Sequence, residues 1–393
     1  MPPPGQTSRA GTLGPRLERA LSLARSATDD QQPVALGYFP RPKSNPFPAI
    51  LYSQLWTRGI APFHLHEADE IAELVASTRR PSQVAFHLQW TYPILREAPS
   101  AQEAQARVDK FLASLDGLRE AGIPLVWTVH NVLPHDCHYV DVEVRLRAGI
   151  AARADLVHTM CDATSELTSP YYQLPSDRTV TIPHPTYDGW YPTLISREQA
   201  RFDLRLSPKA PTYVLVGNLR IYKGLDLLFD AFERVRSQWP SRPRPRLLVA
   251  GRPFAEQDHE HLEARVQELD GAAIEMRRIS EERMATYLQA ADVVVLPYER
   301  ILNSGVLLAA MTFSRTVVVP RTGCLPSIVS EETSSSFDPR NIGSLAAAMA
   351  RAMSLASRPG QPERVRTLAD RHRPEIIGAT FADAIDGLVD RRP

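Results

Sequence analysis

Short apolar runs alternate with longer amphipathic segments along most of this 393-residue chain. Runs such as 34–39 and 124–129 are rich in Val, Leu and aromatic residues, and segments with helical spacing follow them. This alternation is typical of right-handed βαβ units around a mainly parallel sheet. The pattern stops in a polar, proline-broken interval at 187–211 and then starts again at 213–217. The sequence therefore predicts two doubly wound α/β domains in tandem, each with ligands at the carboxyl ends of its strands.

The pattern also sets the expected boundaries of these two Rossmann-like domains. We expect a flexible N-terminal tail at 1–33, a first domain at 34–205 and a second at 206–373, with the C-terminal helix 374–393 packing back on the first. Further strands are expected at 83–88, 155–159, 179–183, 246–251, 273–277, 292–297 and 316–320. Helices are expected at 49–59, 67–77, 101–121, 225–238, 259–269, 281–290, 304–313, 342–355 and 374–389.

One short amphipathic stretch lies inside the N-terminal tail. Leu13, Leu17 and Leu21 are spaced four apart, which places them on one helical stripe. Two interpretations stay open: a weak contact with a membrane surface, or a helix that rests on the body of the protein.

Charge, cysteine content and hydropathy exclude several classes of protein. Lys plus Arg and Asp plus Glu are 45 each, so the chain lacks the basic excess of a nucleic-acid binder. The three scattered cysteines are not the pattern of a disulfide-stapled secreted domain or a zinc cluster. No apolar run is long enough to span a membrane, and the N-terminus builds no signal-peptide core. We expect a cytoplasmic protein, with a peripheral contact at the inner face of the plasma membrane as an option.

The densest motif is Gly217-Asn218-Leu-Arg220-Ile-Tyr-Lys223-Gly224, between an expected strand and an expected helix. Two cations and the unpaired N–H groups of a helix start can meet an anion there, and glycine lets the backbone come close. The spacing fits neither the Walker phosphate loop nor the dinucleotide fingerprint. The alternative is an ordinary solvated loop.

A second candidate anion site follows the expected strand at 292–297. Tyr298 lies just after this strand, and Asn303 or Ser304 is a good cap for the helix that begins near Gly305. The amino end of that helix would offer N–H groups and a positive dipole end to phosphate. An ordinary helix cap is the alternative, but two such helix starts in one domain favour a diphosphate site.

These motifs resemble those of GT-B glycosyltransferases, in the large family-four-like group of bacterial exopolysaccharide and lipopolysaccharide transferases. The Gly217–Lys223 segment resembles the donor-diphosphate motif of the family. Three further segments also resemble family motifs. They are the "Thr-x-His-Asn" strand end at 124–131, the Pro-His turn at 182–185 and the "helix, Ala-Asp, strand, Pro" stretch at 288–298. The four motifs follow one another along the chain in the order that the family has. The resemblance runs from about Val34 to the C-terminus.

The resemblance implies two domains that face a cleft, with the acceptor on the first and a GDP- or UDP-linked sugar on the second. It implies sugar transfer to a glycan or a diphosphate-lipid acceptor in polysaccharide or glycoconjugate synthesis. No cofactor is expected, and no metal, because the chain has no Asp-x-Asp element. The expected donor-binding residues are Gly217, Asn218, Arg220, Lys223, Gly251, Tyr298, Asn303, Ser304 and Gly305.

One departure from the family concerns a pair of glutamates, eight positions apart, that retaining members carry. Ile301 and Ala309 stand at those positions here. The family's usual retention of anomeric configuration is therefore not assumed for this chain.

Catalytic and acceptor-binding residues are expected in the first domain. His130 ends a strand, where a neutral imidazole can bond a sugar hydroxyl or assist proton transfer, and the alternative is a core histidine. Asp136, on the loop that follows, is the candidate general base if the enzyme inverts. His135 and His138 beside it are too few ligands to predict zinc. The expected acceptor-binding residues are Arg41, Lys43, Asn45, His87, Trp90 and Asn131.

Two other functions stay open beside sugar transfer. A GT-B-like epimerase would use the same diphosphate site and act on the nucleotide sugar without an acceptor. A non-catalytic module that binds a nucleotide or a glycan on a degenerate transferase scaffold would turn over neither compound.

Overall fold

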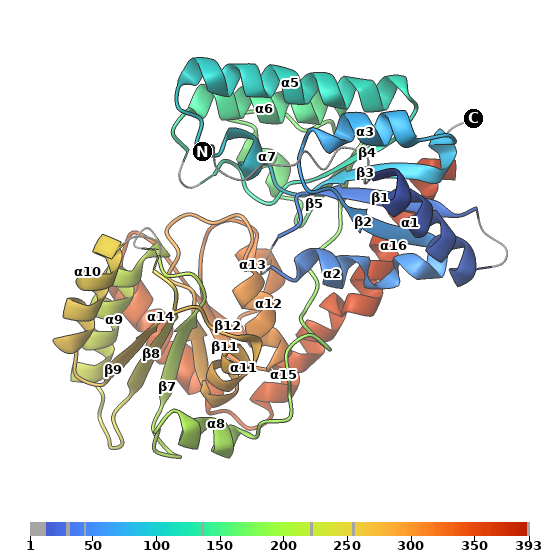
Figure 1. The fold of residues 1–393 in the computed structure, drawn as a ribbon. Coiled ribbons are helices and arrows are strands. Elements are labelled where there is room, and N and C mark those ends of the chain that lie inside the picture. The colour runs from blue at the N-terminus through green and yellow to red at the C-terminus, as the bar shows by residue number, and fades with distance from the viewer. Residues whose placement is uncertain are drawn as a thin grey trace, which may run out of the picture. The chain divides into compact units, whose positions relative to one another are not determined.

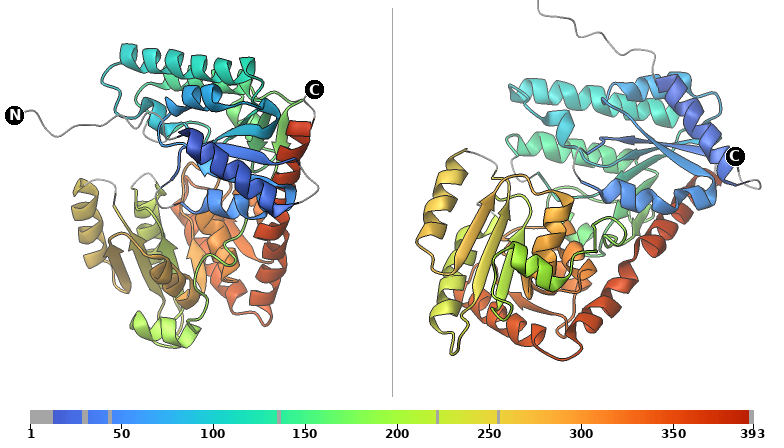
Figure 2. Two further views of the ribbon diagram at one scale, coloured as in Figure 1. Left: turned by 45° about the vertical axis from the view of Figure 1, so that its right-hand side comes forward. Right: turned by 60° about the horizontal axis from the view of Figure 1, so that its bottom comes forward.

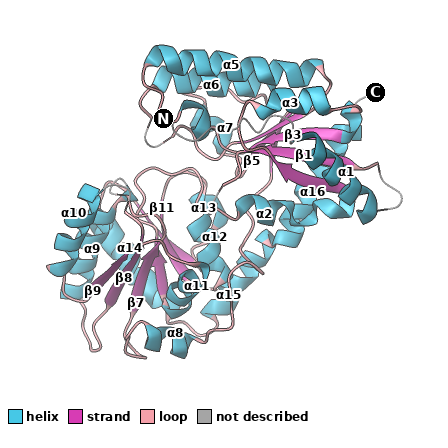
Figure 3. Cartoon of the chain, in the orientation of Figure 1, coloured by secondary structure: helices cyan, strands magenta, loops and turns pink. Residues whose placement is uncertain are grey.

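The computed structural model describes residues 13–28, 32–42, 45–134, 137–220, 223–253 and 256–390 (Figure 1). The chain forms two compact units, which are described separately here. Unit 1 comprises Met1–Pro183 and Glu375–Pro393, and unit 2 comprises His184–Pro374. Each is an α/β domain with helices on both faces of one sheet (Figure 3).

Unit 1 contains a fully parallel six-stranded sheet in the order β2-β1-β3-β4-β5-β6. Its strands are β1 (Val34–Phe39), β2 (Ile60–His64), β3 (Val84–Leu88), β4 (Leu125–Thr128), β5 (Leu156–Thr159) and β6 (Thr179–Thr181). Its helices are α1 (Leu13–Ala27), α2 (Phe47–Leu51), α3 (Glu70–Ser77), α4 (Tyr92–Leu95), α5 (Ala101–Glu120), α6 (Val140–Arg153), α7 (Thr164–Thr168) and α16 (Pro374–Asp390), with short 3₁₀ turns η1 (Tyr52–Arg58) and η2 (Pro81–Gln83).

The C-terminal helix α16 belongs to the core of unit 1. Its residues Ile377, Phe381 and Ile385 are buried in one cluster with Leu36 of β1 and Leu55 of η1. The end of the chain therefore completes the fold of its first domain (Figure 2).

The expected flexible tail is wrong for residues 13–27, which form the packed helix α1. The stripe of Leu13, Leu17 and Leu21 is buried, and α1 lies against β1, β2 and α3. Arg16 also pairs with Glu70 of α3 at 2.7 Å. Because the apolar stripe already faces the domain, it is not available for contact with a membrane.

Strand β2 was not predicted because Pro62 interrupts its apolar pattern. The structure places β2 at the edge of the sheet, paired only with β1 among the described strands, and Pro62 lies opposite Leu36. Proline lacks an N–H donor, and an edge strand tolerates this because one of its sides has no partner.

Unit 2 contains a second parallel six-stranded sheet, in the order β12-β11-β10-β7-β8-β9. Its strands are β7 (Thr212–Val216), β8 (Arg246–Gly251), β9 (Ala272–Met276), β10 (Val293–Val295), β11 (Thr316–Pro320) and β12 (Ser334–Phe337). Its helices are α8 (Arg197–Asp203), α9 (Leu225–Ser237), α10 (Glu256–Gln267), α11 (Glu281–Ala290), α12 (Gly305–Thr312), α13 (Leu325–Ile328), α14 (Ile342–Ala356) and α15 (Gln361–Ala369), followed by the 3₁₀ turn η4 (Asp370–His372).

Unit 2 begins earlier in the chain than the expected boundary at 205/206. Helix α8 packs on α11, and Arg201 is buried and donates to the Ala290 carbonyl at 2.9 Å. Arg197 donates to the Ala291 carbonyl at 2.7 Å. These two arginines hold the proline-broken interval to the end of α11, so it is part of unit 2.

Each sheet has one point at which the chain reverses its direction across the strands. In unit 2 the chain runs outward through β7, β8 and β9, and then returns to β10 on the other side of β7. In unit 1 it runs from β1 to β2 and returns to β3 on the other side of β1. The loops after the two strands at such a point diverge and leave a crevice at their carboxyl ends.

A search of the described residues finds no helix that is both long and apolar enough to cross a membrane.

The packing of α1 generates a test that uses two leucines of the same helix. Leu17 is 2% exposed and Leu23 is 56% exposed. Replacing Leu17 with Ala should lower the free energy of unfolding by about 2 to 5 kcal/mol, since it leaves a cavity. Leu23→Ala should change it by less than about 0.5 kcal/mol. Urea unfolding of the two variants measures the difference, and equal effects would mean that α1 is not packed on unit 1.

Candidate functional site

The β7–α9 loop in unit 2 begins at Gly217, whose backbone touches Gly251 at the end of β8. The N–H of Gly217 donates to the Ala250 carbonyl at 2.9 Å, and Gly217 has a φ of +132°. A Cβ on the neighbouring Gly251 would lie 1.6 Å from the Gly217 carbonyl oxygen. Both positions therefore require glycine, and the loop leaves β7 pressed against the end of β8.

Lys223 is half-buried in this loop and is held by two groups. Its Nζ donates to the Asn218 carbonyl oxygen at 3.2 Å and lies 5.5 Å from the centroid of the Tyr298 ring. Burial, with a smaller contribution from the positive charge of Arg220, lowers the pKa of Lys223 to about 8. A bound anion would stabilise the charged form of Lys223 and raise its pKa again. Anion binding and protonation of this lysine therefore favour each other.

Gly224 ends the loop and fixes its position against β10. It lies just before α9 with a φ of +75°, and a Cβ there would come within 2.0 Å of the Pro297 carbonyl oxygen. The β7–α9 loop and the segment after β10 therefore meet directly at the switch point of this sheet.

The amino end of α12 lies at the same place. A Cβ on Gly217 would be 3.4 Å from Val306 Cγ2, so the first turn of α12 is beside the end of β7. Ser304 is buried, and its hydroxyl accepts from the Leu307 N–H at 3.3 Å as the helix cap. Asn303 is half-buried just before it.

Two residues beside α12 were missing from the expected site. A Cβ on Gly305 would lie 2.3 Å from Tyr187 Oη and 3.6 Å from His184 Nε2, so these side chains pack on the first residue of the helix. The Tyr187 N–H also donates to Thr312 Oγ1 at 2.9 Å. The signal in the sequence was the Pro183-His184-Pro185 turn, which was noted as a motif but not as part of a site.

The structure thus brings the expected donor-binding residues of unit 2 together at the carboxyl ends of β7, β8 and β10. Gly217, Asn218, Arg220, Lys223 and Tyr298 line one small pocket. Two basic side chains line this pocket, and the amino end of the eight-residue helix α12 lies beside its Gly217. This combination suits a phosphate or diphosphate group.

In unit 1, His130 follows β4 and lies in a second small pocket. Its ring stacks on Trp90 with centroids 4.0 Å apart and an angle of 15°, and Phe47 meets it edge-on at 5.0 Å. His130 Nε2 is 2.8 Å from Gln89 Oε1. His130 and Trp90 are both half-buried, and with Asn131 they line the pocket. A flat, partly exposed pair of rings is suited to contact with a sugar.

His87 is wrong as a residue that contacts an acceptor, because it is fully buried in the core. Both of its ring nitrogens are occupied: Nδ1 lies 2.8 Å from Tyr52 Oη, and Nε2 lies 2.7 Å from Thr128 Oγ1. Phe381 of α16 stacks on its ring at 5.2 Å. Strand β3 is buried on both faces, so its sequence has no alternation of apolar and polar residues that would show where His87 points.

The other expected acceptor residues lie in different surroundings. Asn45 uses its Oδ1 to accept from the Phe47 N–H at 3.0 Å, at the start of α2. Arg41 is exposed and lines a pocket with His64, His66 and Glu67 that shares Tyr92 with the His130 pocket. Lys43 and Asp136 lie outside the described residues.

Arg147 of α6 was also missed, and it holds the loop after β4. It is 4% exposed and pairs with Glu143, with 3.3 Å between Nε and Oε2. Its guanidinium donates to the Asn131 carbonyl at 2.9 Å and to Thr91 Oγ1 at 3.0 Å. Burial raises the pKa of Glu143, and Arg147 opposes this effect. Helix α6 itself was not predicted.

Among the described residues, no group of three or more His, Cys, Asp and Glu side chains is arranged to hold a metal ion. His135, one member of the local histidine cluster, lies outside those residues.

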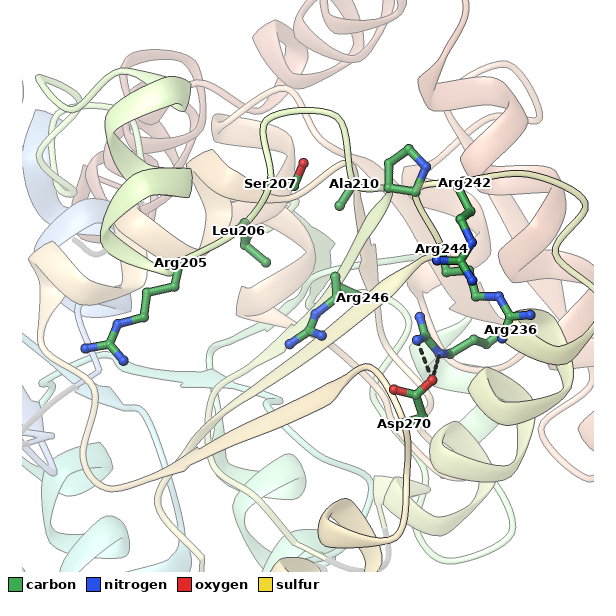
Figure 4. A pocket seen from close by; sticks show the side chains of 10 residues that line it. Arg205, Leu206, Ser207, Ala210, Arg236, Arg242, Arg244, Arg246 and Asp270 are labelled. Carbon is green, nitrogen blue, oxygen red and sulfur yellow. Dashed lines mark hydrogen bonds and ion pairs between the residues drawn. The ribbon is translucent and has the colours of Figure 1, made fainter.

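A much larger pocket, of about 790 Å³, lies at the opposite ends of the same strands of unit 2 (Figure 4). Its lining comes from the segments just before β7, β8 and β9 and from the last turn of α9. It is not at the switch point and contains none of the expected site residues.

Comparisons with known proteins agree with this architecture. Residues 210–354 match the family model described as "Glycosyl transferases group 1". The chain is 29% identical over 238 residues to the GDP-mannose:glycolipid 4-beta-D-mannosyltransferase of Xanthomonas campestris pv. campestris. That match covers 60% of each sequence, so the chain spans about 60% of the length of this curated relative.

Solved structures share the fold over nearly the whole chain. Anabaena HepE in complex with UDP matches with a TM-score of 0.66 and 14% identity, over 90% of this chain and 100% of that one. A glycosyltransferase from Rickettsia africae matches with a TM-score of 0.70 and 12% identity, over 92% and 100%. Residues 210–354 thus carry the sequence of the glycosyl transferases group 1 family, within a chain whose two Rossmann-like domains have the GT-B fold.

Proposed function

We propose that this protein is a glycosyltransferase of the hexosyltransferase class. It moves a sugar from a nucleoside-diphosphate sugar to a glycan or lipid-linked acceptor in polysaccharide or glycoconjugate synthesis. One observation carries this proposal: Arg220, Lys223 and the amino end of α12 converge at the switch point of unit 2. The family match over 210–354 covers that same region.

In this proposal the donor diphosphate binds in unit 2. Arg220 and Lys223 bond its oxygens, and the N–H groups at the start of α12 face the phosphate with the positive end of the helix dipole. The negative charge that develops on the leaving nucleoside diphosphate is then stabilised by groups already in place. Neutralisation by these cations makes a divalent metal and a cofactor unnecessary.

The acceptor binds in unit 1, where Trp90 and His130 offer a ring face and a titratable nitrogen. A sugar ring lies against the aromatic surface, and His130 bonds a hydroxyl or takes its proton. Neither unit then holds both substrates alone, so transfer requires both units of the chain.

The names of similar proteins support guanine and uracil as candidate bases of the nucleotide-sugar donor. The Xanthomonas relative is named for GDP-mannose and a glycolipid, and the Anabaena structure contains UDP. We therefore propose a GDP- or UDP-linked hexose, with a cytoplasmic enzyme meeting a lipid-linked acceptor at the inner face of the plasma membrane.

A panel of nucleotide sugars tests the function in two stages. A thermal-shift screen identifies the nucleoside diphosphate, because a ligand that binds the native state raises its stability. Turnover with and without a lipid-linked acceptor then separates the activities. Acceptor-dependent release of the diphosphate supports transfer, change of the sugar without acceptor indicates an epimerase, and binding without turnover indicates a non-catalytic module.

The pKa of Lys223 gives a prediction for donor binding. A pKa of about 8 means that its positive charge is present below pH 8 and lost above it. Lys223→Ala should weaken nucleoside-diphosphate binding at pH 7 by about 1.5 to 3 kcal/mol, the range for a charged hydrogen bond. In the unchanged protein, affinity should fall by about tenfold from pH 7 to pH 9, as the charged fraction of such a lysine falls.

Calorimetry checks both effects with two matched variants. Lys223→Arg keeps the charge and should remove most of the pH dependence. Lys110→Ala, at an exposed lysine of α5 in unit 1, should bind like the unchanged protein. If the affinity of Lys223→Ala equals that of Lys110→Ala, Lys223 does not contact the diphosphate.

Metal independence gives another prediction. Since two cations and a helix start are proposed to neutralise the diphosphate, turnover should persist in excess EDTA. A radiochemical transfer assay before and after chelation measures this. Loss of turnover that magnesium or manganese restores would show that a metal neutralises the leaving group.

A further inference from the structure

A buried chain of hydrogen bonds runs through unit 1 and ends at His130. It starts at the Ile182 carbonyl oxygen, which lies 2.8 Å from His158 Nε2, and His158 Nδ1 is 2.9 Å from Thr128 Oγ1. From Thr128 it continues through His87, Tyr52 and Gln89 to His130, with every link between 2.7 and 2.8 Å. Except for His130, the side chains that form this hydrogen-bonded network are buried.

The direction of every link follows from its fixed end. A backbone carbonyl only accepts, so His158 Nε2 carries a proton and donates to Ile182. Burial lowers the pKa of His158 to about 4, so the ring is neutral and its Nδ1 has no proton. The Thr128 hydroxyl must then donate to His158, which leaves its oxygen to accept from His87 Nε2.

The remaining hydrogen bonds, from His87 to His130, are oriented in the same way. Burial also lowers the pKa of His87, so this ring is neutral, and its Nδ1 accepts from the Tyr52 hydroxyl. The Tyr52 oxygen accepts from the amide nitrogen of Gln89. That orientation turns Gln89 Oε1 toward His130, and an amide oxygen only accepts, so His130 Nε2 is the donor.

We infer that this network assigns a single tautomer to His130: Nε2 stays a donor to Gln89, and Nδ1 is the ring atom that accepts a proton or a hydrogen bond. The link to Gln89 is the same in the neutral and in the protonated ring, so a proton can be taken up at Nδ1 without disturbing the network. The buried members are positioning residues for the proposed transfer, and they are Tyr52, His87, Gln89, Thr128 and His158. Their catalytic importance rests on the proposed function, whereas the tautomer itself does not.

A pair of substitutions at Thr128 tests the network. Thr128→Ser keeps the hydroxyl that links the two histidines, and Thr128→Val removes it with little change in shape. Without the hydroxyl, the His87 tautomer, the Tyr52 hydroxyl and the Gln89 amide can all reverse. The Nδ1-protonated form of His130 should then appear in long-range ¹H–¹⁵N spectra of the histidine-labelled full chain. The unchanged protein and Thr128→Ser should show only the Nε2-protonated form.

Kinetics give the second readout. Thr128→Val should lower kcat by about tenfold or more with the donor KM unchanged, which is less than the loss of about 10²-fold or more expected when a positioned acid–base group is removed altogether. Thr128→Ser should restore kcat. If Thr128→Val does not fold, Thr128→Ala removes the same hydroxyl and should give the same spectrum.

A neutral His130 ring that carries its only proton on Nδ1 in the unchanged protein, or identical spectra for both Thr128 variants, would overturn the inference. Full turnover of His130→Ala would instead contradict the proposed role of His130 and leave the tautomer result standing.

A separate observation concerns the large pocket at the amino ends of β7 and β8. Five arginines line it: Arg205, Arg236, Arg242, Arg244 and Arg246. Its one carboxylate, Asp270, is already held by Arg236, with 2.6 Å between Nη2 and Oδ2. The other four arginines form no ion pair within the described part of the chain, although the charges of Arg244 and Arg246 also contribute to the lowered pKa of Asp270. The pocket therefore concentrates positive charge in a chain whose formal net charge is zero.

The segment before β8 holds several of these side chains in place. Arginine and proline alternate in it as Arg242-Pro243-Arg244-Pro245-Arg246. Proline restricts the backbone of the residue before it, so Arg242 and Arg244, each followed by a proline, have fewer backbone conformations available. Figure 4 shows Arg236, Arg242 and Arg244 gathered on one side of the pocket. Several guanidinium groups on one side of a pocket can bond the oxygens of phosphate groups.

We propose that this pocket binds an anion with more than one phosphate group, apart from the candidate donor site. The test uses a full-length background in which Arg220→Ala and Lys223→Ala disable that site. Calorimetry with tripolyphosphate should still show binding, and adding Arg242→Ser and Arg244→Ser should weaken it at least about tenfold, as expected for two charged hydrogen bonds. Arg278→Ser, at an exposed arginine beyond the other end of β9, is the control.

Sedimentation with vesicles that contain cardiolipin, a lipid with two phosphate groups, separates the two sources of such an anion. Binding of tripolyphosphate alone indicates a soluble phosphate compound, and arginine-dependent binding of vesicles alone indicates a lipid headgroup. The proposal fails if neither probe binds, or if Arg242→Ser with Arg244→Ser binds like the Arg278→Ser control.

Discussion

The close approach of two backbone segments at the switch point of unit 2 is the constraint on which the candidate donor site depends. Gly224 lies so near the Pro297 carbonyl that no side chain fits between them, and Gly217 meets Gly251 in the same way. These contacts place Arg220 and Lys223 in one pocket with Tyr298, and the amino end of α12 lies beside Gly217 of that pocket. A parallel sheet that returns to its starting strand creates the crevice, and glycine allows the loops to line it closely.

In unit 1 the candidate catalytic residue His130 is oriented by a network of hydrogen bonds, and not by a backbone contact. His130 lies at the surface end of this network. At the buried end, Phe381 of α16 packs against the rings of His87 and His158. The C-terminal helix thus helps to bury the groups that orient the candidate catalytic histidine. This gives a physical reason for the end of the chain to return to its first domain.

The sequence could predict the sheets and the candidate donor site because their signals are local. Glycine, arginine and lysine around a strand end, and a serine at a helix start, lie within short segments whose places in the fold follow from the βαβ pattern. Other features depend on packing between distant segments. The edge position of β2 tolerates Pro62, and the burial of α1 turns an expected tail into a helix of unit 1. His87 was assigned to the acceptor because its position at a strand end was visible, whereas its two buried partners were not.

Hydrogen–deuterium exchange of the full chain, with and without the nucleotide sugar that binds, tests the central claim most directly. The account predicts that the peptides containing Gly217–Gly224 and Ser304–Leu307 become protected, because a bound diphosphate holds the β7–α9 loop and the first turn of α12 in place. Protection confined to the arginine pocket, in peptides of 205–210 and 242–246, would contradict it and place the nucleotide sugar at the other end of the sheet.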